Sequence, residues 1–232
     1  MIPRRSGALV VATLAAVVLA GAGCSGETGG RSTSTTTRGI PAAPRVLVLG
    51  DSNLFESGAD VDTALRAVGV EPTLHGLPGY GAKHMDLYWS KEVPELLKTD
   101  PDVVVVGLGT NDALESADVL AFPARLDQMM ELLGDRPVIW ITHVDDRPGS
   151  SEGAGRTINE MIRAAPDRWT NLTVLDFTVT MAEDPTILHP DALHFTVAGR
   201  KVYAQEIARA SSERLPASAL SDRGLRARRR AA

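Results

Sequence analysis

Short runs of apolar, mostly β-branched residues recur along the chain. Three of them predict strands that are buried on both faces, as in a parallel sheet, at residues 46–49, 103–106 and 138–142. Two weaker runs, at residues 71–77 and 172–177, predict two more strands. The stretches between these runs are amphipathic rather than uniformly apolar, so helices are expected to separate the strands.

Helical spacing of apolar positions predicts helices at residues 61–68, 85–98, 119–133, 156–165 and 197–211. Gly69 is a good residue to end the first helix, and Thr196 is a plausible N-cap for the last. Pro94 is expected to kink or split the second helix, whereas Pro123 is tolerable only near the first turn of the third. Residues 178–193 show no regular pattern, and we expect them to be irregular.

Alternating strands and helices predict right-handed crossovers and a parallel sheet with helices on both faces. Five strands fit a flavodoxin-like α/β fold with the strand order 2-1-3-4-5. In such open sheets, ligands bind at the carboxyl edge, beside the strand where the order reverses. Here that strand is the first, residues 46–49, and no internal repeat interrupts the pattern.

The N-terminal segment has the pattern of an export signal. Arg4 and Arg5 precede an apolar stretch at residues 8–20, and small residues then lead to Cys24, so residues 1–23 are predicted to be a signal peptide. This arrangement resembles the lipobox of bacterial lipoproteins, in which that cysteine is lipidated, although Gly21 stands where lipoboxes usually carry leucine. The alternative is ordinary secretion, with Cys24 removed or left free.

Composition divides the rest of the chain into a linker, a domain and a C-terminal segment. Residues 24–43 are rich in Gly, Ser and Thr and predict a flexible linker, and residues 44–215 hold the predicted domain. Residues 45–215 carry 15 Lys and Arg against 27 Asp and Glu, a net charge of −12 that argues against a nucleic-acid substrate. Cys24 is the only cysteine, so the domain is held without disulfides.

The C-terminal segment, residues 216–232, is basic and predicts a disordered tail. Its arginines are Arg223, Arg226, Arg228, Arg229 and Arg230. A weak contact with anionic lipid or wall polymer is the alternative interpretation.

Residues suited to acyl transfer follow the predicted strands. Ser52 follows the first strand, Gly79 the second and Asn111 the third, and Asp191 and His194 follow the fifth. Because the carboxyl ends of parallel strands share one edge of a sheet, these distant residues can converge.

Each residue type suits one part of that chemistry. A serine hydroxyl needs a base, which His194 can supply, and Asp191 can orient the imidazole and stabilise its cation. The oxyanion of a tetrahedral intermediate needs fixed donors. The backbone N–H groups of Ser52 and Gly79 and the side-chain amide of Asn111 are three candidates.

Four sequence blocks at these places resemble those of the SGNH (GDSL-type) hydrolase family, in its order and spacing. They are Gly50-Asp51-Ser52-Asn53, Leu77-Pro78-Gly79-Tyr80-Gly81, Gly109-Thr110-Asn111-Asp112 and Asp191-Ala192-Leu193-His194. The resemblance implies a three-layer α/β/α fold and esterase, lipase, thioesterase or carbohydrate-acetylesterase activity, with no metal or cofactor. It makes Ser52 the nucleophile, His194 the base, Asp191 the orienting acid, and Gly79 and Asn111 oxyanion donors. The second block is the loosest match, and Gly81 competes with Gly79 as donor.

Other motifs are less persuasive. Ser151 lies in a Gly-x-Ser-x-Gly pattern at residues 149–153, but a polar stretch separates it from the preceding strand, so a loop bordering the site is expected. His143, Asp145 and Asp146 suggest metal ligands, yet a solvated loop near the pocket is the simpler interpretation. The remaining histidines are interpreted as loop structure or as lacking evident partners: His189, His75 and His84.

The sequence thus predicts an exported serine ester hydrolase, anchored by lipid on the outer side of the cytoplasmic membrane or otherwise secreted. Its substrate is expected to be a small-molecule, lipid or glycan acyl ester, and the protein is expected to be a monomer that binds no nucleic acid. An O-acyltransferase acting on envelope glycans, or a catalytically silent glycan-binding module, are the alternatives.

Overall fold

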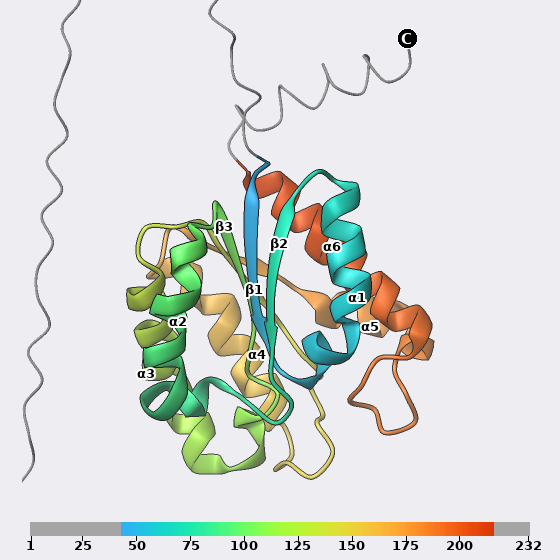
Figure 1. The fold of residues 1–232 in the computed structure, drawn as a ribbon. Helices are drawn as coiled ribbons and strands as arrows, with labels where there is room; N and C mark the ends of the chain where they lie inside the picture. Colours follow the sequence, from blue (N-terminus) through green and yellow to red (C-terminus); the bar gives the residue numbers. More distant parts are fainter. Residues whose placement is uncertain (1–42, 216–232) are drawn as a thin grey trace, which may run out of the picture. The chain divides into compact units, whose positions relative to one another are not determined.

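A computed structural model describes residues 43–215 of the chain; the predicted signal peptide, nearly all of the linker and the basic tail lie outside the described residues. The described residues form a five-stranded sheet with the order β2-β1-β3-β4-β5 (Figure 1). All neighbouring strands are parallel. The strands are β1 (Arg45–Gly50), β2 (Glu71–Gly76), β3 (Val103–Gly107), β4 (Val138–Ile141) and β5 (Leu172–Leu175). The predicted fold class and strand order are therefore confirmed.

Helices cover both faces of the sheet (Figure 1). They are α1 (Ser52–Ala67), α2 (Ser90–Leu96), α3 (Ser116–Leu133), α4 (Ala154–Ala164), α5 (Phe177–Glu183) and α6 (Val197–Arg214). Helices α1, α5 and α6 pack on one face, and α2, α3 and α4 pack on the other. No helix in the described range is long and apolar enough to cross a membrane.

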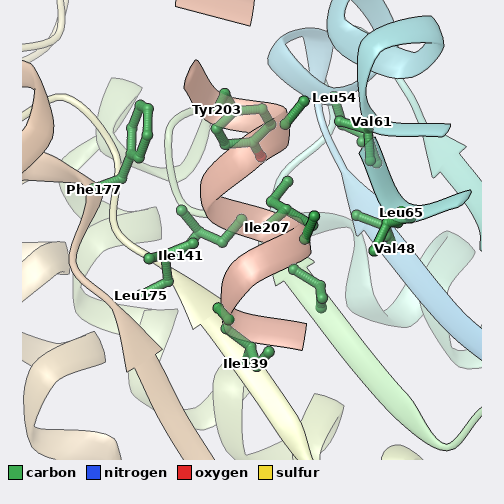
Figure 2. Close-up of a cluster of buried hydrophobic side chains, with 14 of the residues drawn as sticks. Val48, Leu54, Val61, Leu65, Ile139, Ile141, Leu175, Phe177, Tyr203 and Ile207 are labelled. Carbon is green, nitrogen blue, oxygen red and sulfur yellow. The ribbon is translucent and has the colours of Figure 1, made fainter. Parts of the chain in front are cut away.

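Alternate residues of each central strand supply two separate hydrophobic cores. In β1, Val46 and Val48 point toward α1 and α6, whereas Leu47 and Leu49 point toward α2 and α3. Figure 2 shows the first core, in which Ile207 of α6 lies over the sheet. All four β1 residues are essentially inaccessible to solvent. This burial on both faces explains why the strand is a continuous apolar run.

Helix α1 begins at Ser52, well before residue 61, where its apolar spacing becomes visible. Its N-cap is Asp51, whose carboxylate accepts a hydrogen bond from the backbone N–H of Asn53 at 2.9 Å. The turn that carries Ser52 is therefore fixed by a capping interaction rather than by hydrophobic periodicity.

Helix α5 was not expected, because residues 178–193 lack a regular pattern. Strand β5 ends at Leu175, and Phe177 and Met181 then bury one side of a short helix against the first core. Two buried positions in a seven-residue helix are too few to produce a periodic signal.

The predicted helix over residues 85–98 is broken, but not at Pro94. A π-helical turn (Met85–Trp89) precedes α2, and Pro94 lies within α2. Trp89 is fully buried and its indole N–H donates to the Gly81 carbonyl at 2.9 Å, so packing of this side chain sets the irregular turn. Pro123 is also placed differently from the expectation. It lies in the interior of α3, which is held by a row of buried residues including Phe122 and Leu126.

Candidate active site

The register of the sheet brings three sequence blocks together. Gly50 at the end of β1 pairs with Gly76 of β2 on one side and with Gly107 of β3 on the other. Ser52, Gly79 and Asn111 each follow one of these three aligned strand ends. The central position of β1 is therefore what places Ser52 between the loops of the two neighbouring strands.

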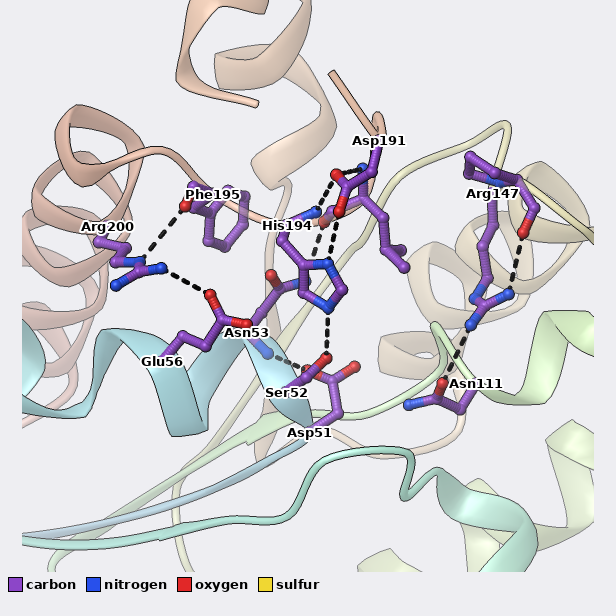
Figure 3. Close-up of polar contacts among 12 residues, drawn as sticks. Asp51, Ser52, Asn53, Glu56, Asn111, Arg147, Asp191, His194, Phe195 and Arg200 are labelled. Carbon is purple, nitrogen blue, oxygen red and sulfur yellow. Dashed lines mark hydrogen bonds and ion pairs between the residues drawn. The ribbon is translucent and has the colours of Figure 1, made fainter. Parts of the chain in front are cut away.

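Ser52, His194 and Asp191 form a continuous hydrogen-bonded chain (Figure 3). The Ser52 Oγ lies 3.1 Å from His194 Nε2, and His194 Nδ1 lies 2.7 Å from Asp191 Oδ2. A carboxylate can only accept, so the ring proton belongs on Nδ1 and leaves Nε2 free to accept from the serine hydroxyl. This is the tautomer that a general base for Ser52 requires.

The loop that carries His194 is fixed by its own hydrogen bonds. Asp191 Oδ1 accepts from the backbone N–H groups of Leu193 and His194, each at 3.0 Å. Ala192, between Asp191 and Leu193, has a left-handed backbone with φ of 51°, which is uncommon for a residue with a side chain. The Asn53 side-chain amide donates to the Leu193 carbonyl at 3.3 Å, so α1 and the His194 loop are directly connected.

Asp191 is held in its charged form. Desolvation acts to raise the pKa of this carboxyl, but hydrogen bonds from the His194 ring and from backbone N–H groups outweigh it and lower the pKa to about 2. An ionised Asp191 can orient the ring and stabilise a histidine cation without itself taking a proton.

In Figure 3, Asn111 lies to the right of Ser52 and below the Arg147 guanidinium, whereas His194 lies above Ser52. Its Nδ2 donates to the Tyr80 carbonyl at 2.7 Å, and its Oδ1 accepts from the Arg147 guanidinium at 3.3 Å. One Nδ2 hydrogen remains available for an oxyanion. As the first residue of α1, Ser52 has a backbone N–H without an intrahelical partner, which suits the same role.

Gly79 and Gly81 differ in how their N–H groups are used. The Gly81 N–H donates to His84 Nδ1 at 3.1 Å. The Gly79 N–H makes no hydrogen bond within residues 43–215, and Gly79 has a positive φ of 80°. This difference favours Gly79 over Gly81 as an oxyanion donor, because its N–H is uncommitted.

Sequence reasoning missed two buried carboxylates that shape the site. Asp112 accepts from the backbone N–H groups of Ala82 and Lys83, at 2.8 and 2.6 Å, and so ties the loop after β2 to the loop after β3. Asp51 caps α1 beneath Ser52. Burial raises the pKa of each carboxyl to about 6. In the sequence, the only indication of a role for Asp51 and Asp112 was that each lies next to a predicted site residue, Ser52 or Asn111.

The other motif residues are not assembled into a second site. Ser151 is exposed, and no hydrogen bond in the described part of the chain joins its side chain to a histidine or a carboxylate. His143 is buried rather than in a solvated loop, and burial lowers its pKa to about 4. Asp145 accepts from the Asn159 amide at 2.8 Å. Within residues 43–215, no group of His, Cys, Asp and Glu could hold a metal ion.

The remaining histidines have structural contacts. His189 closes the loop around Asp191, because its N–H donates to the His194 carbonyl at 2.8 Å. The other two have partners that the sequence did not reveal: His75 Nε2 lies 2.7 Å from the Tyr88 hydroxyl, and the His84 ring stacks on Tyr80.

Comparisons with known proteins agree with the geometry. The family model described as GDSL-like Lipase/Acylhydrolase matches residues 48–202. A lipase/acylhydrolase from Enterococcus faecalis is 25% identical and has a TM-score of 0.65, with 75% of this chain and 97% of that chain covered. A comparison with curated protein sequences finds no match.

Two more distant structures share the fold. The C-terminal catalytic domain of peptidoglycan O-acetyltransferase A from Streptococcus pneumoniae is 19% identical, with a TM-score of 0.58 and coverage of 76% of this chain and 98% of that chain. The esterase EstA from a Pseudoalteromonas species is 14% identical, with a TM-score of 0.59 and coverage of 73% and 97%. At these identities the likeness is evidence for the fold alone.

Proposed function

The chain belongs to the GDSL-like lipase/acylhydrolase family, and from this premise we propose that it hydrolyses carboxylic esters through an acyl-enzyme on Ser52. One observation carries the proposal: the unbroken hydrogen-bonded chain from Ser52 through His194 to Asp191. A base, an orienting carboxylate and free oxyanion donors are together what a serine nucleophile requires.

The proposed reaction proceeds in two steps, acylation of Ser52 and hydrolysis of the acyl-enzyme. Ser52 Oγ attacks the ester carbonyl carbon while His194 Nε2 takes the hydroxyl proton, and the resulting oxyanion is bound by the donors of Ser52, Gly79 and Asn111. The intermediate collapses, the C–O bond to the alcohol breaks, and His194 returns the proton to the leaving alkoxide. Water then attacks the acyl-enzyme by the same route, which releases the carboxylic acid and regenerates Ser52.

The substrate and the location form a second part of the proposal. We propose that the mature protein acts outside the cytoplasmic membrane, tethered through a lipid on Cys24, on small-molecule, lipid or glycan acyl esters. The support is the N-terminal sequence pattern, which lies outside the described residues. Replacement of Cys24 by Ala should release the protein from membranes or stall its processing.

Transfer of the acyl group to a sugar hydroxyl is the second candidate, because hydrolysis and transfer share the acyl-enzyme. It is supported by the fold shared with the Streptococcus pneumoniae peptidoglycan O-acetyltransferase domain. Product analysis with and without a glycan acceptor would separate the two activities. A silent glycan-binding module, the third candidate, would not react with a serine-directed probe.

The test compares two serines that differ in their surroundings. Ser52→Ala should abolish hydrolysis of a graded panel of p-nitrophenyl esters and labelling by a fluorophosphonate probe. Ser151→Ala is the matched control, because Ser151 is exposed in a loop, and it should retain both activities. Loss of labelling in the Ser151 variant alone, with labelling kept in the Ser52 variant, would refute the proposed nucleophile.

A further inference from the structure

Arg147 has an unusual environment for a cation near the candidate site. It follows β4 and is half-buried, and its guanidinium points toward Asn111 (Figure 3). One terminal nitrogen donates to Asn111 Oδ1 at 3.3 Å and the other donates to the Pro148 carbonyl at 3.1 Å. Within residues 43–215, no carboxylate lies within ion-pair distance of Arg147, and its Nε is buried without a hydrogen-bond partner.

The loop holds Arg147 in place from both sides. The Ser150 hydroxyl donates to the Arg147 carbonyl at 2.6 Å. On the other side, the Asp145 carbonyl accepts from the Arg156 N–H at 3.0 Å, and the Asp145 carboxylate accepts from the Asn159 amide. The loop is therefore tied to the start of α4, so the fold holds the backbone from which the Arg147 side chain extends.

The contacts of Asn111 define which way its amide points. An asparagine amide has nearly the same shape when it is rotated by half a turn, so only its partners decide where the nitrogen lies. The Tyr80 carbonyl can only accept and therefore requires Nδ2. The Arg147 guanidinium can only donate and therefore requires Oδ1. In the rotated state, both of these hydrogen bonds would be lost and replaced by unfavourable contacts.

We propose that Arg147 is a positioning residue for the oxyanion hole, which holds Asn111 Oδ1 so that the Nδ2 hydrogens face Tyr80 and the oxyanion. The inference rests on the proposed ester hydrolysis, because it assigns Arg147 to the same site. A donor fixed before the reaction has no reorientation cost when charge appears on the substrate oxygen. The positively charged guanidinium beside Oδ1 also polarises the Asn111 amide, which strengthens its N–H groups as donors.

The charge of Arg147 is maintained despite its surroundings. Burial lowers the pKa of the guanidinium, and the carboxylate of Asp51 acts in the opposite direction. A guanidinium nevertheless stays protonated in proteins at any ordinary pH. Other basic residues near these loops are engaged by carboxylates: Lys83 and Arg125 both pair with Asp118. Arg147 is thus the cation whose charge is directed at Asn111.

The test is a double-mutant cycle with p-nitrophenyl acetate as substrate. Arg147→Met should lower kcat on the order of tenfold, as expected for a lost charged hydrogen bond, with KM changed less than twofold. The same change in an Asn111→Ala background should have almost no effect, because no amide remains to be positioned. Arg147→Lys should retain an intermediate kcat. Arg168→Met is the matched control, since Arg168 is an exposed arginine that pairs with Asp127 outside the loops of the site, and it should match the wild type.

Three outcomes would overturn the proposal. Equal losses of kcat in both backgrounds would mean that Arg147 acts independently of Asn111. An unchanged kcat would remove Arg147 from the site. An effect limited to KM would identify a substrate-binding residue instead.

A second measurement separates this proposal from the proposed function. The side-chain amide resonances of Asn111, assigned in NMR spectra by their loss in Asn111→Ala, should be sharp in the wild type and shifted or broadened in Arg147→Met. The amide resonances could respond in this way while the wild type neither hydrolyses esters nor reacts with a fluorophosphonate. That result would support the contact between Arg147 and Asn111 and refute the proposed ester hydrolysis. If they do not respond, the positioning role fails, whatever the activity.

Discussion

At the scale of single residues, the carboxylates around Ser52 differ because their surroundings differ. Asp191 is half-exposed and accepts several hydrogen bonds, which hold its pKa at about 2. Asp51 is buried, and desolvation raises its pKa to about 6. Asp191 is therefore charged in mildly acidic solution, where Asp51 is largely protonated. This difference supports the proposed orienting role of Asp191, whereas Asp51 caps α1.

The pH dependence of the reaction follows from this division. Because hydrogen bonds lower the pKa of Asp191 to about 2, this carboxylate should stay ionised in mildly acidic solution, so a fall of kcat/KM there should not come from Asp191. His194→Ala should lower kcat/KM more than Asp191→Ala, since the aspartate orients the base but accepts no proton. A profile that stays flat from acid to neutral pH, with chemistry limiting, would exclude a histidine base.

Asn111 permits a direct test of the oxyanion hole. Its side chain can be removed without disturbing the backbone, and a fixed donor in a dry site acts mainly on the transition state. Asn111→Ala should therefore lower kcat by roughly 10²–10³, about 3–4 kcal/mol, with a smaller change in KM. If Asn111 only stabilises its turn, kcat would be normal and the melting temperature lower. Both quantities should be measured on one preparation.

At the scale of elements, the start of α6 supports the loop that carries His194. Thr196 caps α6 by accepting from the Gly199 N–H at 3.1 Å, and its hydroxyl contacts the Ile187 carbonyl at the same distance. Gly199 lies so close to this segment that a Cβ would fall 2.1 Å from the Ile187 carbonyl oxygen. An isolated β-bridge between Leu188 and Phe195 completes the contact. The position of His194 therefore depends on the packing of the helix that follows it.

Two glycine substitutions test this dependence. Gly199→Ala should destabilise the protein by about 1–3 kcal/mol, because the methyl group displaces the backbone at Ile187. It should also lower kcat in the folded fraction, because the shift reaches His194. Gly58→Ala is the matched control within α1, where the nearest neighbour of a new Cβ is a Leu74 methyl carbon at 4.0 Å. That variant should gain roughly 0.5–1 kcal/mol in unfolding free energy. Denaturant melts with kinetics would show both effects, and a Gly199→Ala variant that equals the wild type would refute the close contact.

At the scale of the whole molecule, carboxylates with shifted pKa values divide into two groups. Asp51 and Asp112 have values raised to about 6 by burial, so the folded protein binds protons at these sites more tightly than the unfolded chain does. Asp176 has a value lowered to about 2, chiefly by its hydrogen bonds with Arg163, and Asp191 is lowered to about 2 as well. The first group stabilises the fold below about pH 4 and loses that contribution as the pH rises through about 6. The second group stabilises it above about pH 4 and loses that contribution as the pH falls toward 2.

We therefore expect Asp51 and Asp112 to lower thermal stability as the pH rises from about 4 to 7, whereas buried His143, whose pKa is lowered to about 4, acts in the opposite direction over the same range. Each raised group contributes on the order of 2 kcal/mol to the decline from pH 4 to pH 7. Residues 45–215 carry a net charge of −12, and their mutual repulsion acts in the same direction. Melting temperatures measured from pH 3 to pH 8 at constant ionic strength would test this expectation.

Asp51→Asn is the control for the pH profile, because asparagine also caps helices but carries no charge. The variant should show a smaller decline in stability between pH 4 and pH 7. An Asp51→Asn variant whose melting temperature follows the wild-type pH profile in parallel would contradict the raised pKa of Asp51.

The sequence by itself determined the architecture and the main chemistry of the candidate site. Runs such as residues 46–49 and 103–106 predict strands buried on both faces, because they are short, rich in β-branched residues and followed directly by glycine, with no face for solvent. A sheet of parallel strands then has one carboxyl edge, so Ser52, Asn111 and His194 had to be candidates for one site. The apolar runs and the motifs that follow them are local signals, because each is formed by residues that are consecutive in the sequence.

Tertiary structure decided what depends on distant neighbours. The π turn before α2 forms where Trp89 packs in the core. Helix α5 forms where Phe177 and Met181 pack against the first core. The contact of Asp112 with Ala82 and the contact of Arg147 with Asn111, on which its proposed role rests, join residues 30 and 36 positions apart along the chain. Burial, which sets the pKa values of the carboxylates, and the orientation of an amide are properties of assembled surroundings. No pattern of neighbouring residues along the chain encodes them, because the groups that define them meet only after folding.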